Sequence, residues 1–271
     1  MKLLQSLFAS SNPQRLYDNA LACITDGNYA KASRLLEKAL PLAPTSAAIH
    51  FTAAFCFMEL AKGKTGASEP ALTAQLEKPA TYCRRAVELS DEGGGLTNDQ
   101  IAKACLLVGT YYRHARDYDA AIRFLERALS ICQETLPPRM ELSATYYLRG
   151  DHKKALVLAR ECLTAEPASE GTRRHWSALC EELGIEPYST LPEEEKRRIY
   201  RDFKMQSEME WLGGLARAVD AIGRGPKVDF KELREAGFTR IASHYGINRF
   251  DIILIFMEGD MKKWPLTGVV G

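Results

Sequence analysis

Small side chains recur at one fixed spacing in three separate parts of this chain. Within each unit the small positions are twelve and then seven residues apart, and two of the units add a proline five residues later. The three sets are Ala20, Ala32, Ala39 and Pro44; Gly109, Ala121 and Ala128; and Ser143, Ala155, Cys162 and Pro167. Two antiparallel helices that pack closely need a small side chain wherever their backbones approach. The spacing therefore predicts a series of helical hairpins.

The residues around the small positions support this prediction. Residues 27–29, 116–118 and 150–152 are of types that favour turns, and they lie where one helix must give way to the next. Two stretches resemble the tetratricopeptide repeat (TPR) family, whose unit of about 34 residues is a helix, a turn and a second helix. The matching residues are Gly27 to Ala32 with Leu36, Glu37, Lys38, Ala39 and Pro44, and Asp117 to Ala121 with Leu125, Glu126, Arg127 and Ala128. The resemblance implies an all-α fold, a TPR-type α-solenoid of helical hairpins.

The second unit departs from the pattern. Ala54 stands 34 residues after Ala20, but the second helix of this unit aligns best on Cys83 and Ala86, about 13 residues late. We therefore predict an insertion over residues 61–79, which are rich in glycine and proline, and a further loop over residues 91–98. Both are expected to be exposed and mobile. After the fourth unit, residues 172–183 predict one more helix that covers the end of the stack.

The chain is expected to fall into three parts. Residues 1–12 predict an N-terminal helix or tail, and residues 13–185 predict a repeat domain of about four repeats with the covering helix. Residues 186–271 predict a C-terminal helical module that opens with a long helix from about residue 193. The basic run 196–198 follows three glutamates, a pattern typical of a solvated helix face.

The resemblance also implies a binding surface, because the first helices of successive TPR units line a concave groove that commonly holds a peptide or a partner's helix. Carried over by spacing, the groove residues are Tyr17, Leu21, Ile24, Phe51, Phe55, Met58, Lys103, Leu106, Thr110, Arg113, Met140, Ala144 and Tyr147. This surface is mostly apolar, and Tyr17 and Leu21 replace the Lys and Asn with which some relatives clamp an acidic C-terminus. It suits an amphipathic helix or a hydrophobic segment of another protein. The alternative is that the chain's own C-terminal helices fill it.

A second pattern lies near the C-terminus. Residues 239–258 resemble a helix-turn-helix, in which Ala242 permits close helix packing and Gly246 permits the turn. The second helix is nevertheless apolar from Phe250 to Phe256, whereas base readout calls for several exposed polar or basic side chains. We expect a packing or docking module. The alternative is a DNA-binding regulator that uses this segment as reader and the repeats as its partner-sensing domain.

Composition narrows the functional classes further. Lys and Arg number 36 against 35 Asp and Glu, so no overall field draws the chain to nucleic acid or an anionic membrane. No apolar stretch approaches the roughly 20 residues that span a bilayer. Seven cysteines without a CxxC pair predict reduced thiols and a cytoplasmic location. The sequence contains no recognisable catalytic, cofactor or metal motif, so we predict a non-catalytic scaffold, adaptor or chaperone-like assembly factor whose partner is another protein.

Overall fold

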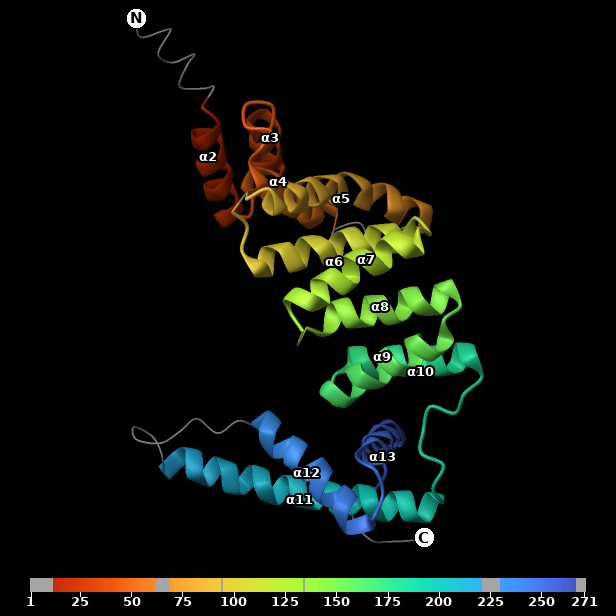
Figure 1. Ribbon diagram of the computed structural model, residues 1–271. Helices are drawn as coiled ribbons and strands as arrows, with labels where there is room; N and C mark the ends of the chain where they lie inside the picture. Colours follow the sequence, from red (N-terminus) through yellow and green to blue (C-terminus); the bar gives the residue numbers. More distant parts are fainter. Residues whose placement is uncertain (1–11, 62–68, 94, 134, 221–229, 267–271) are drawn as a thin grey trace, which may run out of the picture. The chain divides into compact units, whose positions relative to one another are not determined.

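The structure is a computed structural model that describes residues 12–61, 69–93, 95–133, 135–220 and 230–266, without the side chains of residues 69, 207–220 and 230–235. Every regular element in these ranges is an α-helix (Figure 1), which confirms the predicted all-α class. The predicted N-terminal helix or tail falls outside the described residues, apart from Asn12.

The contacts divide the chain into two compact units, residues 1–158 and residues 159–271, here called the N-terminal unit and the C-terminal unit. The division falls inside α9, and the predicted boundary between residues 185 and 186 stays a prediction. The repeat helices form pairs along the chain (Figure 1). They are α2 (Pro13–Thr25) and α3 (Tyr29–Ala39), α4 (Ala47–Ala61) and α5 (Glu69–Asp91), α6 (Asn98–His114) and α7 (Tyr118–Ile131), and α8 (Leu136–Arg149) and α9 (His152–Ala165).

The small positions of the repeat lie where the paired helices meet. Their side chains have no exposed surface at Ala20, Ala32, Ala39, Ala121, Ala128, Ser143 and Ala155. At Gly109 a Cβ atom would lie 2.6 Å from Cγ of Leu125, so this approach has no room for a methyl group. Ser143 Oγ donates a hydrogen bond of 2.8 Å to the carbonyl of Ala155 across the α8–α9 pair. The predicted helical hairpins are therefore confirmed, for the physical reason that the spacing suggests.

Local signals set the ends of these helices. Asn28 and Asp117 cap α3 and α7, and each accepts a hydrogen bond from a backbone N–H three residues on, at 3.1 and 3.0 Å. Thr97 and Gln100 form a reciprocal capping box at the start of α6. Gly150 ends α8 in the left-handed region, with φ of 92°. The turns predicted between the helices are thus present at the residues that favour them.

The predicted loop over residues 61–79 is wrong for its second half, because α5 already begins at Glu69 and runs through Pro79. Residues 62–68 lie outside the described residues. The buried positions of α5 are Leu76, Pro79, Ala80, Cys83, Ala86, Val87 and Leu89. They repeat every three or four residues, as the inner face of a helix does. Burial of this continuous face outweighs the loss of one backbone hydrogen bond at a proline inside the helix.

The C-terminal unit includes α10 (Glu170–Leu183), α11 (Glu193–Asp220), α12 (Phe230–Tyr245) and α13 (Arg249–Lys262). Helices α11, α12 and α13 pack against one another around aromatic side chains. The rings of Phe203 and Phe238 stack at 4.5 Å, and Phe256 lies edge-on to both. Phe238 belongs to this core, and α12 runs through it without a break.

One ion pair in the C-terminal unit is buried. The Nζ atom of Lys196 lies 3.0 and 2.8 Å from the two carboxylate oxygens of Glu258, and the two side chains are 11% and 2% exposed. The expectation that residues 196–198 form a solvated face is therefore wrong for Lys196, although Arg197 and Arg198 are exposed. Its partner lies 62 residues further along the chain, too far to be recognised from local spacing.

Acidification is expected to destabilise the N-terminal unit partly through His50. Its Nε2–H donates to the carbonyl oxygen of Pro44 at 3.0 Å, and its buried Nδ1 has no hydrogen-bond partner among the described residues. Burial, and secondarily the nearby Arg85, lower the pKa of His50 below 6.5. The unfolded chain therefore binds this proton first, so stability falls as the pH drops below about 6.5 and through the folded-state pKa. Urea denaturation of the wild type and of His50→Gln between pH 8 and pH 5 checks this, and equal losses in both would contradict it.

Candidate functional site

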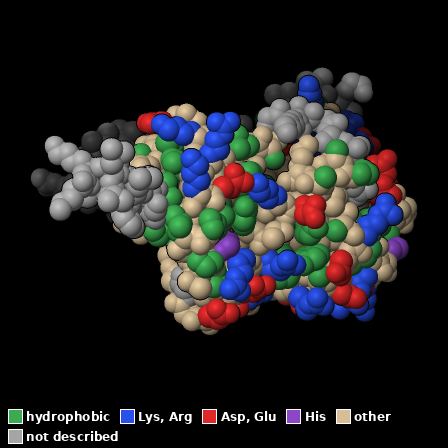
Figure 2. All heavy atoms as spheres, turned by 90° about the horizontal axis from the view of Figure 1, so that it is seen from above, with side chains coloured by type: hydrophobic (Ala, Val, Ile, Leu, Met, Phe, Trp, Pro, Cys, Tyr) green, Lys and Arg blue, Asp and Glu red, His purple; other side chains and the backbone are tan. Residues whose placement is uncertain are grey.

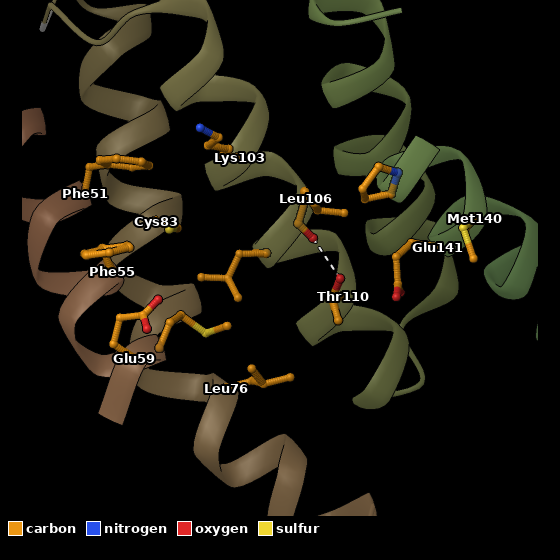
Figure 3. A pocket seen from close by; sticks show the side chains of 13 residues that line it. Phe51, Phe55, Glu59, Leu76, Cys83, Lys103, Leu106, Thr110, Met140 and Glu141 are labelled. Carbon is orange, nitrogen blue, oxygen red and sulfur yellow. Dashed lines mark hydrogen bonds between the residues drawn. The ribbon is translucent and has the colours of Figure 1, made fainter. Parts of the chain in front are cut away.

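An open cavity of about 630 Å³ lies within the N-terminal unit and is here called the groove (Figure 3). Helices α4, α5, α6 and α8 supply its lining. The lining residues are Phe51, Phe55, Met58, Glu59, Leu76, Cys83, Lys103, Leu106, Leu107, Thr110, Pro137, Met140 and Glu141. Most of these side chains are apolar, so the groove favours contact with an apolar ligand surface.

Helical periodicity brings the lining residues together. On α4, Phe51, Phe55 and Glu59 are spaced by four residues and follow one another along one face (Figure 3). The opposite face of the same helix is buried in the unit. Phe55 is 42% exposed and meets Tyr29 only edge-on at 6.0 Å. The fold therefore leaves an aromatic side chain accessible inside the groove.

Charged groups lie at the ends and rim of the groove. Lys103 lies at the same end as Phe51, whereas Glu59 lies at the other end (Figure 3). Lys103 Nζ pairs with Asp99 of its own helix at 2.7 Å. Arg113 Nε donates to Glu141 at 2.8 Å and links α6 to α8. The charged side chains thus lie at the edges of the apolar lining and do not interrupt it.

Cys83 contributes a thiol to the lining, but the thiol is poorly suited to nucleophilic chemistry. Burial, and secondarily the neighbouring Cys105, raise the pKa of Cys83 to about 12, so the thiol stays protonated at neutral pH. Thr110 Oγ1 donates to the carbonyl of Leu106 on its own helix at 3.0 Å. The arrangement suits binding by shape and apolar contact.

Seven of the thirteen predicted groove residues line this cavity. They are Phe51, Phe55, Met58, Lys103, Leu106, Thr110 and Met140. Their role in partner binding stays a prediction.

The other six predicted residues do not line this cavity. Tyr17 and Ile24 pack against the core that α2 shares with α3 and α4, and Leu21 is 40% exposed on α2. Arg113 reaches the cavity only through its ion pair with Glu141. On α8, Ala144 is half-buried, as is Tyr147, whose ring lies 5.5 Å from that of His152.

Six lining residues were not predicted. Leu76 and Cys83 lie on α5, a second helix of its hairpin, whereas the family resemblance carries over only first helices. Glu59, Leu107 and Glu141 each directly follow a predicted groove residue, and Pro137 stands three residues before Met140 on α8. Apolar residues that recur every three or four positions from Leu76 through Pro79 to Cys83 are the sequence signal that could have indicated the contribution of α5.

The helix-turn-helix-like segment has the predicted shape but an inaccessible second helix. Gly246 adopts φ of 67° between α12 and α13, and Asn248 caps α13 by accepting from the backbone N–H of Asp251 at 3.0 Å. Residues 252–259 are all buried, and the ring of Phe250 lies 5.3 Å from that of Trp176. On the face shown in Figure 2, acidic and basic side chains are interspersed. The burial of the second helix gives little support to the DNA-reading alternative.

Two further searches cover only the described parts of the chain. None of the described helices is both long enough and apolar enough to cross a bilayer. Among the same residues, no group of three or more His, Cys, Asp or Glu side chains is placed to hold a metal ion.

Comparison with known proteins supports the fold of this chain. The sequence model of the tetratricopeptide repeat family matches residues 101–139, and no curated protein sequence matches. The crystal structure of MamA matches with a TM-score of 0.51 and 17% identity, over 64% of this chain and 83% of that chain. YrrB, described as a TPR protein with an unusual peptide-binding site, matches with a TM-score of 0.50 and 13% identity, over 64% of this chain and 79% of that chain.

These findings agree with the geometry of the hairpins. At such identities the structural matches show the fold alone, and the family match lies on α6 and α7 with the start of α8. Residues 101–139 match the tetratricopeptide repeat family, and the helical hairpins form a TPR-type α-solenoid.

Proposed function

We propose that this chain is a non-catalytic scaffold, adaptor or chaperone-like assembly factor that holds an apolar helical segment of a partner protein in the groove. The TPR fold supports a role in protein–protein interaction, and YrrB is an example of the fold described with a peptide-binding site. The main observation in support of this proposal is the apolar groove, in which Phe55 remains accessible.

The lining favours an apolar ligand over an acidic one. An amphipathic helix presents anchors at positions i, i+3, i+4 and i+7, which suits a groove lined by helices. Each Å² of apolar surface removed from water contributes about 25 cal/mol, before the cost of association. Lys103 is already paired with Asp99, so it offers little to an acidic terminus. A cytoplasmic location belongs to the same proposal, because six of the seven free cysteines are buried as thiols.

Peptide display tests this proposal on the full chain. A random library of twelve-residue peptides on phage is selected against the protein, and the dissociation constants of enriched peptides are measured by fluorescence anisotropy. We expect enriched peptides to carry apolar residues at helical spacing. Phe55→Glu is expected to weaken their binding at least about tenfold, or about 1.4 kcal/mol, because it places a charge in the apolar lining.

A matched control separates an effect at the groove from the effect of placing a charge at any exposed apolar position. Leu42 is 47% exposed in the same unit and does not line the groove. Leu42→Glu is expected to leave peptide binding unchanged, and circular dichroism checks that both variants keep their helix content. Equal binding by wild type and Phe55→Glu, or enrichment of acidic peptides without an apolar pattern, would sink the proposal.

A further inference from the structure

A second cavity lies between α5 and α6 and is separate from the groove. It has a volume of about 180 Å³ and shares no lining residue with the groove. At about 30 Å³ for each water molecule it has room for about six waters, so it suits a small molecule better than a peptide segment. Ala80 and Val108 give it a buried apolar floor. Its other lining residues are polar, and they are Glu77, Thr81, Arg84, Tyr111 and Tyr112.

The helical period separates this cavity from the groove on α5. Leu76 and Cys83, which line the groove, are seven residues apart and lie on one face of the helix. Each residue of a helix turns by about 100° around the axis, so the three polar residues of α5 lie about 100–160° around the helix from Cys83. A small molecule in the second cavity therefore leaves the groove open to a partner.

One end of the second cavity accepts hydrogen bonds. Glu77 and Thr81 lie one turn apart on α5 and line this end. The Glu77 carboxylate has no hydrogen-bond or ion-pair partner among the described residues. Thr81 Oγ1 donates to the backbone carbonyl of Glu77 at 2.9 Å, which leaves its lone pairs available to a donor. This end therefore suits a cationic N–H group.

The other end of the cavity donates hydrogen bonds. Arg84 follows Glu77 by seven residues, about 10.5 Å along the helix axis. Its Nη1 atom donates to the hydroxyl of Tyr112 at 2.9 Å, and its Nε atom lies 4.0 Å from Glu88. The Tyr112 hydroxyl accepts this bond and keeps its own proton to donate. Tyr111, whose ring lies 5.3 Å from that of Tyr112, has no hydrogen bond through its hydroxyl to any described residue. This end therefore suits an anionic oxygen.

We propose that the second cavity binds a free α-amino acid as a zwitterion. Its ammonium group lies at Glu77 and Thr81, and its carboxylate lies at Arg84 and the two tyrosine hydroxyls. A charge-assisted hydrogen bond spans about 2.8 Å, and bond lengths put the amine nitrogen about 2.5 Å from the carboxyl carbon. The bound ligand thus bridges about 8–9 Å, which is close to the two helical turns between Glu77 and Arg84.

Charge selects the zwitterion over ligands with one charge. An anion at the Arg84 end would leave Glu77 without a counter-ion and would be repelled by it. A cation at the Glu77 end would meet the same difficulty at Arg84. A zwitterion satisfies both side chains at once, because its two charges are opposite and a short distance apart.

The side chain of the amino acid has space beyond the Glu77 end. A cavity of about 320 Å³ adjoins the second cavity there, since the two share Glu77 and Thr81 as lining residues. Lys78 also lines it, and its ammonium group already pairs with Glu37. The adjoining space therefore accepts side chains of different sizes and imposes no strong charge preference.

Methyl NMR on the full chain tests the site directly. Protein labelled with ¹³C in the methyl groups of alanine and valine is titrated with each of the standard L-α-amino acids. We expect the signals of Ala80 and Val108 to shift with at least one of them. The dissociation constant is expected to be millimolar, because Glu77 and Arg84 are exposed and water screens their charges. For the amino acid that binds most tightly, the N-acetyl derivative and the amide each lack one charge, and each is expected to bind at least about fivefold more weakly.

Charge variants locate the binding site. Glu77→Gln and Arg84→Gln are each expected to weaken amino-acid binding at least about fivefold, with helix content checked by circular dichroism. Glu92→Gln and Arg123→Gln remove exposed charges of the same unit outside the cavity, and both are expected to leave binding unchanged. Phe55→Glu is also expected to leave it unchanged, so this inference and the proposed function can fail separately. The proposal is overturned if no amino acid shifts either signal, if the N-acetyl derivative or the amide binds as tightly as the amino acid, or if Glu77→Gln and Arg84→Gln bind like the wild type.

Discussion

Replacing Glu258 with alanine is expected to lower the free energy of unfolding of the C-terminal unit by about 3–5 kcal/mol. The Glu258 carboxylate is 2% exposed and accepts from Lys196 with both oxygens, and from Lys262 at 2.7 Å. Without it, the buried ammonium group of Lys196 keeps a hydrogen bond of 3.3 Å to the carbonyl of Ser189. A buried charge without its counter-ion carries a large desolvation cost.

Tryptophan fluorescence reads this unit selectively. All three tryptophans, at positions 176, 211 and 264, belong to residues 159–271. Urea denaturation followed by their emission therefore measures the effect of Glu258→Ala where it is expected. Glu193→Ala removes an exposed ion pair with Arg197 and is expected to leave the denaturation midpoint nearly unchanged. An equal loss of stability in the two variants would show that the buried ion pair stabilises the unit no more than the exposed pair does.

A double substitution distinguishes the loss of the pair from the loss of packing. Lys196→Met with Glu258→Leu removes both charges and keeps side chains of similar volume. It is expected to recover most of the stability that Glu258→Ala loses, because two apolar residues need no counter-ion. Failure to recover would indicate that the pair stabilises the unit through its hydrogen bonds to neighbouring groups.

The repeat fold was predictable because its determinant is local. The small residues recur at fixed distances, and each marks a point where two sequence-adjacent helices touch. Ala32 and Ala39 are buried on the helix that follows the turn at residues 27–29. Ser143 and Ala155 are twelve residues apart, as Ala20 and Ala32 are, and they are buried in the same way. Physical contact and sequence spacing coincide in such a hairpin, so one can be inferred from the other.

The groove and the C-terminal unit depend on contacts that spacing does not record. Pro79 suggested a loop, but burial across the whole inner face of α5 keeps it helical and brings Leu76 into the groove. Lys196 belongs to a charged run whose pattern is typical of solvent, yet its partner Glu258 comes from a distant apolar helix. Both outcomes are decided by tertiary packing, which outweighs local residue preferences.

Leu125→Ala is expected to destabilise the N-terminal unit by about 2–5 kcal/mol, since the side chain is fully buried. Gly109→Ala is expected to cost about 0–2 kcal/mol, because a clash of about 1–3 kcal/mol is offset by about 1 kcal/mol of helix preference. The added Cβ would lie 2.6 Å from Cγ and 2.8 Å from Cδ2 of Leu125. Leu125→Ala removes both of these atoms, so the double variant should be less destabilised than the sum of the two single variants.

Urea denaturation followed by circular dichroism at 222 nm measures this coupling, because the N-terminal unit contains no tryptophan. We expect the double variant to recover at least about 0.5 kcal/mol, as contacting residues do in such cycles. The remaining contact, 3.3 Å from the added Cβ to the carbonyl oxygen of Ala121, keeps the recovery incomplete. Leu36, fully buried on α3, supplies the control, and Leu36→Ala should combine additively with Gly109→Ala. Additivity at both sites would mean that close approach at Gly109 does not determine how α6 and α7 pack, and that the small positions of the repeat need another explanation.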